Sequence, residues 1–250
     1  MAKRGTITIV PSVHFSSTHR RRVRETIRDR RPDVVAVELD ERRFDRLDRR
    51  SRLRPDELSR GASPTTTPTY RTLQAIQRTV ARLYGFDPEE SDMESAIQTA
   101  AELGIEIAPI DEPLEDVLST LSSKVGLVTV PKMLLRMQLM GPAERLRQIE
   151  TLTLPFRDVR SGDDVQPMVD QMRTLVPEVA DQLLDRRDRA MAERLYALRH
   201  EGYDVVAVVG AAHHNGILAA LDELEERDAE PTVSVPIRKS GRSVTEVPIE

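Results

Sequence analysis

Two short aliphatic runs constrain the fold of this chain more than any other feature of its sequence. Residues 34–39 are apolar except for Glu38, and residues 205–209 are apolar throughout. Continuous runs of this length and composition are typical of strands that are buried on both faces of a parallel sheet. Parallel strands require crossover connections, which are usually helices. The chain is therefore predicted to be an α/β protein.

Further strands and helices follow from residue alternation and spacing. The segments 6–10, 105–110 and 232–237 alternate in the manner of strands. Ser and Thr cap candidates precede a predicted helix that ends at about residue 30, and helical spacing also runs from about 177 to 200. Each end of the chain therefore resembles a β-α-β unit, and together the two units predict a central, mostly parallel sheet.

The two end units and the middle of the chain suggest one domain with an insertion. We expect a single α/β domain over residues 1–250, in which a largely helical section at about 50–200 is inserted between the two units. A polar tail is expected at about 239–250.

Composition excludes several classes of function. The net charge of −5 offers no global basic field for nucleic acid. Cysteine is absent, so the chain has no disulfide, no thiolate nucleophile and no cysteine-based zinc site. No apolar run approaches the roughly 18 residues of a membrane span, and the expected location is the cytoplasm. The sequence also lacks the Walker A, G-x-G-x-x-G and G-x-S-x-G motifs.

Polar side chains follow the predicted strands at their carboxyl ends. These residues are His14, Glu38, Asp111 and His213. In open parallel sheets, ligands bind outside the carboxyl ends of the strands. Imidazole nitrogen and carboxylate oxygen suit Zn²⁺, Mn²⁺ or Fe²⁺, and such an ion can activate water for hydrolysis. If the strands are neighbours, the sequence predicts a metal or acid–base site at this edge.

Each of these residues also has a structural interpretation. A lone histidine after a strand is more often a loop or capping residue than a ligand. Glu38 shares a predicted strand face with aliphatic residues, and a structural ion pair with an arginine would explain its burial. Asp111 could cap a helix that begins near Leu114.

Arg187 is unusual because it lies on the apolar stripe of its predicted helix. A buried arginine needs a carboxylate or a bound anion. Pairing with Glu38 or Asp111 is the structural interpretation, and binding of a substrate oxyanion is the functional one. Asp188 lies close to the same helix face.

The remaining histidines are weaker candidates. His214 adjoins His213 and is a candidate to support it. His19 and His200 are expected at the surface.

Several segments of the chain resemble the TraB/PrgY family, in the order in which that family has them. The segment from Thr6 to His14, followed by Arg31-Pro-Asp-Val-Val-Ala-Val-Glu-Leu-Asp-Glu-Arg42, is similar to the start of these proteins. The later matching segments are Asp92-Met93, Ile110-Asp111, Arg187-Asp188 and Val206-Ala-Val-Val-Gly-Ala-Ala-His-His-Asn-Gly-Ile217. The resemblance covers about residues 5–222. The family is linked to pheromone shutdown and belongs with the Tiki and GumN proteins.

The resemblance implies a fold, a site and a cofactor. The family carries two G-x-x-H motifs; the second is intact from Gly210 to His213, whereas Pro11 replaces the first glycine. The fold is shared with erythromycin-esterase-like (EreA) and ChaN-like proteins, and Tiki relatives are described as metal-dependent proteases. By resemblance, His14, Glu38 and His213 become ligands of a divalent metal ion, namely Mn, Co, Zn or Fe.

Two main hypotheses for function follow. The first is a metal-dependent, peptidase-like hydrolase with Glu38, Arg187 and His213 as catalytic groups. In it, substrate is bound by Asp111, Asp188 and His214. The alternative is a non-catalytic regulator that binds and sequesters a peptide or small ligand in the same cleft, and a haem or metal carrier is a third possibility by analogy with the ChaN fold. The expected partner is a peptide or small molecule, not nucleic acid, and a homo-oligomer remains open.

Overall fold

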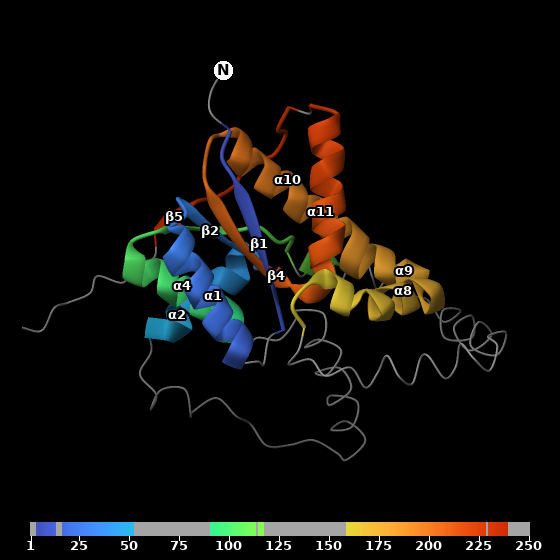
Figure 1. Cartoon of the computed structure of the whole chain (residues 1–250), viewed down its shortest axis with the longest axis horizontal. Helices are drawn as coiled ribbons and strands as arrows, with labels where there is room; N and C mark the ends of the chain where they lie inside the picture. Colours follow the sequence, from blue (N-terminus) through green and yellow to red (C-terminus); the bar gives the residue numbers. More distant parts are fainter. Residues whose placement is uncertain are drawn as a thin grey trace, which may run out of the picture.

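The fold is a layered α/β structure around one twisted sheet (Figure 1). It was obtained as a computed structural model, which describes residues 4–13, 17–52, 91–113, 115–117, 159–228 and 230–239. The sheet has five strands in the order β1-β4-β2-β3-β5. These strands are β1 (Ile7–Ser12), β2 (Val34–Val37), β3 (Glu106–Pro109), β4 (Val205–Gly210) and β5 (Arg238–Lys239).

All strand pairs among β1 to β4 are parallel, and only β5 runs antiparallel, against β3. The predicted α/β class with a mostly parallel central sheet is therefore confirmed. The last long strand along the chain, β4, lies between the first two, and all six of its residues are buried. Because β1 to β4 are parallel, their carboxyl ends lie at one edge of the sheet, which we call the carboxyl edge.

Helices cover both faces of the sheet (Figure 1). One face carries α1 (Ser17–Arg30), α2 (Glu41–Arg52) and α4 (Ser91–Leu103). The other face carries α10 (Arg186–His200) and α11 (Ala211–Glu226). The shorter helices η3 (Gly162–Asp164), α8 (Gln166–Leu175) and α9 (Pro177–Ala180) precede α10.

The alternation of β2 divides its side chains between two aliphatic layers. Val35 and Val37 join the layer beneath α1, α2 and α4, whereas Val34 and Ala36 join the layer beneath α10 and α11. The same alternation directs the side chain of Glu38 towards the face of α10 and α11. The carboxylate of Glu38 therefore lies on the face of the sheet that α10 covers, and α10 carries the buried Arg187.

The predicted helix at about 177–200 is present but not uniform. A π-helical segment, Asp181–Asp185, joins α9 to α10. Such π-bulges frequently occur at functional sites. The helix ends at His200 with Glu201 as its C-cap, and Gly202 follows with a φ of 97°, a backbone conformation that favours glycine.

The expected strand at 232–237 is corrected by the structure. Residues 231–237 have no regular secondary structure, and the short strand β5 follows them. Val235 and Ile237 nevertheless pack against the aliphatic layer of α10 and α11. The alternation therefore reflects partial burial of the side chains without a hydrogen-bonded ladder.

The remaining predictions on domain organisation fall largely outside the described residues. Of the expected insertion, residues 53–90 and 118–158 are not described, and neither is the tail from residue 240. A single domain with a helical insertion accordingly stays a prediction. Among the helices that the structure does describe, none has the length and apolar character to cross a membrane.

Candidate functional site

Five buried side chains meet at the carboxyl edge. Glu38 directly follows β2, Asp111 lies just beyond β3, and His213 belongs to the first turn of α11 after β4. Arg187 and Asp188 come from the first turn of α10. All five are at most 6% exposed, and we call them the Arg187 cluster.

The guanidinium of Arg187 links the ends of two strands. Its Nε donates to Asp111 Oδ1 at 3.0 Å, and its Nη2 donates to Asp111 Oδ2 at 2.7 Å. The same Nη2 donates to Glu38 Oε1 at 2.6 Å. This forked, charge-assisted geometry is among the stronger side-chain interactions in proteins. Arg187 is fully buried, and the expected pairing with Glu38 or Asp111 is confirmed, since it bonds to both.

The other side of the guanidinium faces His213. Arg187 Nη1 lies 3.2 Å from His213 Nε2, and His213 Nδ1 lies 2.6 Å from Asp188 Oδ1. An arginine nitrogen can only donate, so Nε2 accepts in this contact when the imidazole is neutral. The neutral tautomer with its proton on Nδ1 then satisfies both contacts, because Nδ1 donates to Asp188.

The first and the last residue of the G-x-x-H motif, Gly210 and His213, both contact the carboxylate of Glu38. The backbone N–H of Gly210 donates to Glu38 Oε2 at 2.6 Å, and His213 Nε2 lies 3.3 Å from Glu38 Oε1. One turn between strand and helix therefore brings a backbone donor and an imidazole to the same carboxyl group.

Burial and charge act in opposite directions on the acids and the base of the cluster. Burial would lower the pKa of His213, but Glu38 and Asp188 outweigh it and the pKa is raised. Burial would raise the pKa of Asp111, yet Arg187 and Arg43 hold it below its usual value. Burial raises the pKa of Asp188, and His213 offsets only part of that effect.

Arg43 is a neighbour of the cluster that sequence analysis missed. Its Nη1 lies 3.3 Å from Asp111 Oδ2, and the residue is 9% exposed. Asp40 Oδ1 accepts a hydrogen bond from the backbone N–H of Arg43 at 2.9 Å, so Asp40 is the N-cap of α2. A cap at Asp40 places Arg43 in the first turn, close to the carboxyl edge, and that signal was present in the sequence.

Comparison with known proteins identifies the family. Residues 2–233 match the model of the TraB/PrgY/gumN family. The chain belongs to this family. It is also 27% identical, over 241 residues, to the uncharacterized protein MJ1365 of Methanocaldococcus jannaschii. The match covers 95% of this chain but only 59% of that relative, so the chain spans well under two thirds of its length.

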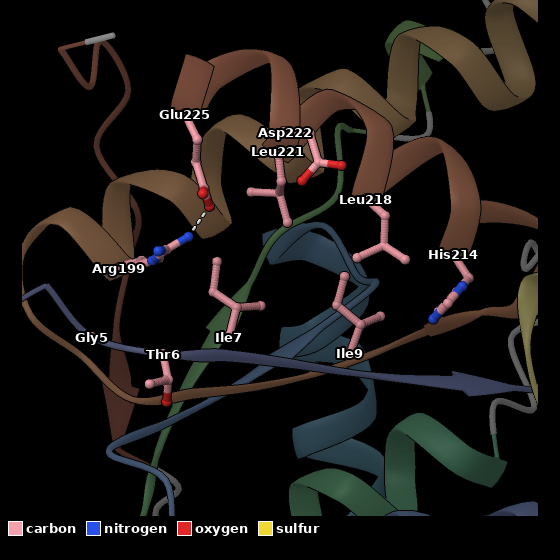
Figure 2. A pocket seen from close by; sticks show the side chains of 10 residues that line it. All are labelled: Gly5, Thr6, Ile7, Ile9, Arg199, His214, Leu218, Leu221, Asp222 and Glu225. Atoms are coloured by element: carbon pink, nitrogen blue, oxygen red, sulfur yellow. Dashed lines mark hydrogen bonds and ion pairs between the residues drawn. The ribbon is translucent and has the colours of Figure 1, made fainter. Parts of the chain in front are cut away.

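Two residues assigned to the TraB-family site lie elsewhere or are not described. His14, the third proposed metal ligand, is outside the described residues. The sequence places His214 beside His213, but the Nδ1 of His214 lies 2.9 Å from Asn215 Oδ1, outside the Arg187 cluster. As Figure 2 shows, it lines a groove between β1 and α11.

His19 corrects a further expectation for this TraB-family chain. It was expected at the surface, but it is fully buried. Its Nδ1 accepts from the backbone N–H of Val13 at 3.3 Å. The first turn of α1 packs against the end of β1, and helical spacing alone does not reveal which turn of a polar helix is covered in this way.

The donor atoms of a metal site are present in part. His213 Nε2 and Glu38 Oε1 are an imidazole nitrogen and a carboxylate oxygen, which are common ligands of Zn²⁺ and Mn²⁺. Within the described ranges, no group of three or more His, Cys, Asp or Glu side chains is arranged to hold an ion. Arg187 contacts both donor atoms in the TraB-family cluster.

Proposed function

We propose that this TraB-family chain is a metal-dependent hydrolase, peptidase-like in its chemistry, that works at the Arg187 cluster. The observation that carries the proposal is the 3.3 Å separation of His213 Nε2 and Glu38 Oε1. Protein ligands lie about 2.0–2.2 Å from a zinc ion, so two ligands of one ion lie within about 4.4 Å of each other. The third ligand that we propose is His14.

The contacts of His213 and Glu38 support this assignment. Metal-binding histidines usually donate their other ring nitrogen to a carboxylate, which fixes the ring and the tautomer. Asp188 is in that position at Nδ1 of His213. Arg187 and the Gly210 N–H hold the two oxygens of Glu38. When bound, a divalent ion lowers the pKa of its water and so supplies a nucleophile at neutral pH.

The arginines give the site its positive charge. Arg187 and Arg43 both lie at Asp111, and we propose that they stabilise the negative oxygen that develops on a substrate carbonyl. Asp111 and Asp188, first assigned to substrate binding, then act by positioning Arg187 and His213. Arg187 Nη1 donates to His213 Nε2, so metal binding through Nε2 costs that hydrogen bond.

The second candidate is a non-catalytic regulator that binds and sequesters a peptide or small ligand at the carboxyl edge. One observation favours it. Arg187 already pairs Glu38 and Asp111, and Asp188 pairs His213, so the cluster is electrostatically satisfied by its own side chains. A regulator would use the cluster as a rigid support for a binding surface, without turnover.

Metal content and peptide hydrolysis, measured together, separate the candidates. Purified wild type is loaded with Zn²⁺, Mn²⁺, Co²⁺ or Fe²⁺, and bound metal is measured by elemental analysis beside cleavage of a peptide library. For the hydrolase, His213→Ala should lower the metal content and reduce turnover by orders of magnitude. His200→Ala, at the far end of α10, is the matched control and should change neither.

Each outcome is informative. Turnover by protein that elemental analysis shows to be free of metal, or equal turnover by wild type and His213→Ala at equal metal occupancy, contradicts the metal-dependent hydrolase. Bound metal or bound peptide with no turnover under any metal supports the regulator. Glu38→Gln provides a second test, because it keeps the shape of the side chain while weakening both metal binding and the pairing with Arg187.

A further inference from the structure

Strand β1 forms one edge of the sheet, and a groove runs along it beneath α11 (Figure 2). The groove has a volume of about 470 Å³. Its apolar lining comes from Ile7 and Ile9 of the strand and from Leu218 and Leu221 of the helix. Leu218 is 40% exposed and is the exposed large hydrophobic residue of the described chain.

The hydrogen-bonding direction of β1 can be determined from its pairing with β4. Val205 N donates to Thr6 O, and the parallel register pairs Ile7 with Val205. In a parallel ladder, alternate residues direct both backbone groups towards the same neighbour. Thr6 and Thr8 therefore face β4, whereas the N–H and C=O groups of Ile7 and Ile9 face away from the sheet.

The open stretch of edge is short and has defined ends. In the described part of the chain, β1 pairs with β4 alone. Pro11 also faces outward, and its lack of an N–H suits an edge position. At the other end, the N–H of Gly5 donates a hydrogen bond to Arg199 O at 2.9 Å. The outward-facing donors that remain in the strand are those of Ile7 and Ile9.

Three residues that line the groove are evenly spaced along α11. His214, Leu218 and Asp222 are spaced four residues apart, so they lie on one face of the helix. A two-fold axis near Leu218 would bring His214 of one copy to Asp222 of another, and the reverse. Asp222 is exposed, whereas the neighbouring Glu225 is paired with Arg199.

We propose that this edge is the interface of a homodimer in which the β1 strands of two copies pair antiparallel about Thr8. Ile7 of each copy then lies opposite Ile9 of the other, and these residues exchange both of their outward hydrogen bonds. The sheet continues across the dimer, the Leu218 side chains cover the groove, and His214 approaches Asp222 of the second copy. A second copy fits better than a foreign peptide because the backbone groups of β1 and the His214 and Asp222 side chains both complement themselves under one axis.

A cysteine placed on the axis tests this geometry directly, because the chain has no other cysteine. Thr8 would be a non-hydrogen-bonded antiparallel pair with its own copy, with Cα atoms about 4.5 Å apart. That separation lies within the range of a disulfide. Thr8→Cys should therefore become a covalent dimer on mild oxidation, and Arg21→Cys, on the exposed side of α1, should not.

Charge exchange tests the helix contact. Asp222→Lys should shift the protein towards monomer in sedimentation velocity runs over a range of concentrations, and so should Leu218→Glu. Adding His214→Asp to Asp222→Lys should restore the dimer, because residues of opposite charge then meet across the axis. Circular dichroism melting curves establish that each variant is folded.

Three results would overturn the proposal. These are a wild type that stays monomeric over the whole concentration range, a dimer in which Thr8→Cys cross-links no better than Arg21→Cys, and a dimer that Asp222→Lys leaves unchanged. The first would leave the groove to a peptide or another partner. None of these results bears on metal content or turnover, so the dimer and the proposed hydrolase are tested separately.

Discussion

Arg187 lies at the centre of the cluster, where a structural role and a functional role would use the same contacts. A fully buried guanidinium that pairs two carboxylates contributes to folding whether or not the site is catalytic. Removal of one partner from a buried ion pair leaves an uncompensated charge in the interior, and this is more costly than the loss of an exposed pair. Stability and activity must therefore be measured on the same variants.

Arg187→Met should lower the free energy of unfolding by about 3–5 kcal/mol, because Glu38 and Asp111 lose their buried cation. Chemical denaturation measures this loss. Arg186→Met is the matched control, since the Arg186 side chain is 40% exposed and pairs with Glu112 at 3.0 Å. It should cost no more than about 1 kcal/mol. Equal costs for the two variants would contradict the buried network.

Asp111 predicts a specific pH dependence of stability. Arg187 and Arg43 hold its folded pKa below the unfolded value of 3.8. A carboxyl group with a lowered pKa contributes stability that is present above the unfolded pKa and is lost as the pH falls through the folded pKa. Wild type should therefore lose stability below about pH 4 more steeply than Asp111→Asn, measured as unfolding free energies from pH 7 to pH 3. Parallel curves for the two proteins would contradict this prediction.

At the level of elements, the close approach of α10 to α11 depends on a glycine. Gly216 lies one turn beyond His213, and a Cβ atom at this position would overlap the carboxylate of Asp188. Asp188 can therefore lie against the backbone of α11 and hold Nδ1 of His213. Gly216 is thus a positioning residue for the imidazole.

Gly216→Ala should destabilise the protein even though alanine normally stabilises a helix interior by about 1 kcal/mol relative to glycine. The reason is the overlap with Asp188, and the measurement is the melting temperature. In an Asp188→Ala background the overlap with the carboxylate is gone and only the Cβ of residue 188 stays close, at 3.1 Å. The same Gly216→Ala change should therefore lower the melting temperature much less there. An increase in both backgrounds would show that Asp188 does not need this space.

At the level of the whole molecule, stability should be concentrated in the centre of the sheet. Strand β4 is paired on both sides and buried along its length, whereas β5 is a two-residue edge strand. Backbone amides in the most buried, paired strands usually exchange only through global unfolding. Hydrogen exchange should therefore be slowest at Val206–Val208 and fast at Arg238. Comparable protection of β4 and β5 would contradict this order.

The sequence by itself determined the features that depend on local pattern. The aliphatic runs identified β2 and β4 as buried parallel strands, and helical spacing placed Arg187 on an apolar stripe. Burial of a charge in turn demanded a partner, so Glu38 and Asp111 could be named as the candidates. The family could be identified from the order of short motifs along the chain.

Only the tertiary structure decided which distant segments meet. Glu38 and Arg187 are 149 positions apart, and no local pattern specifies that β4 lies between β1 and β2. The burial of His19 and the pairing of Arg43 with Asp111 likewise depend on which helix turns lie at the carboxyl edge. The alternation at 232–237 shows the same division, since periodicity reports which side chains avoid water and does not report which backbone they pair with. Strand order is a property of the packed sheet, in which contacts across long sequence separations decide the arrangement.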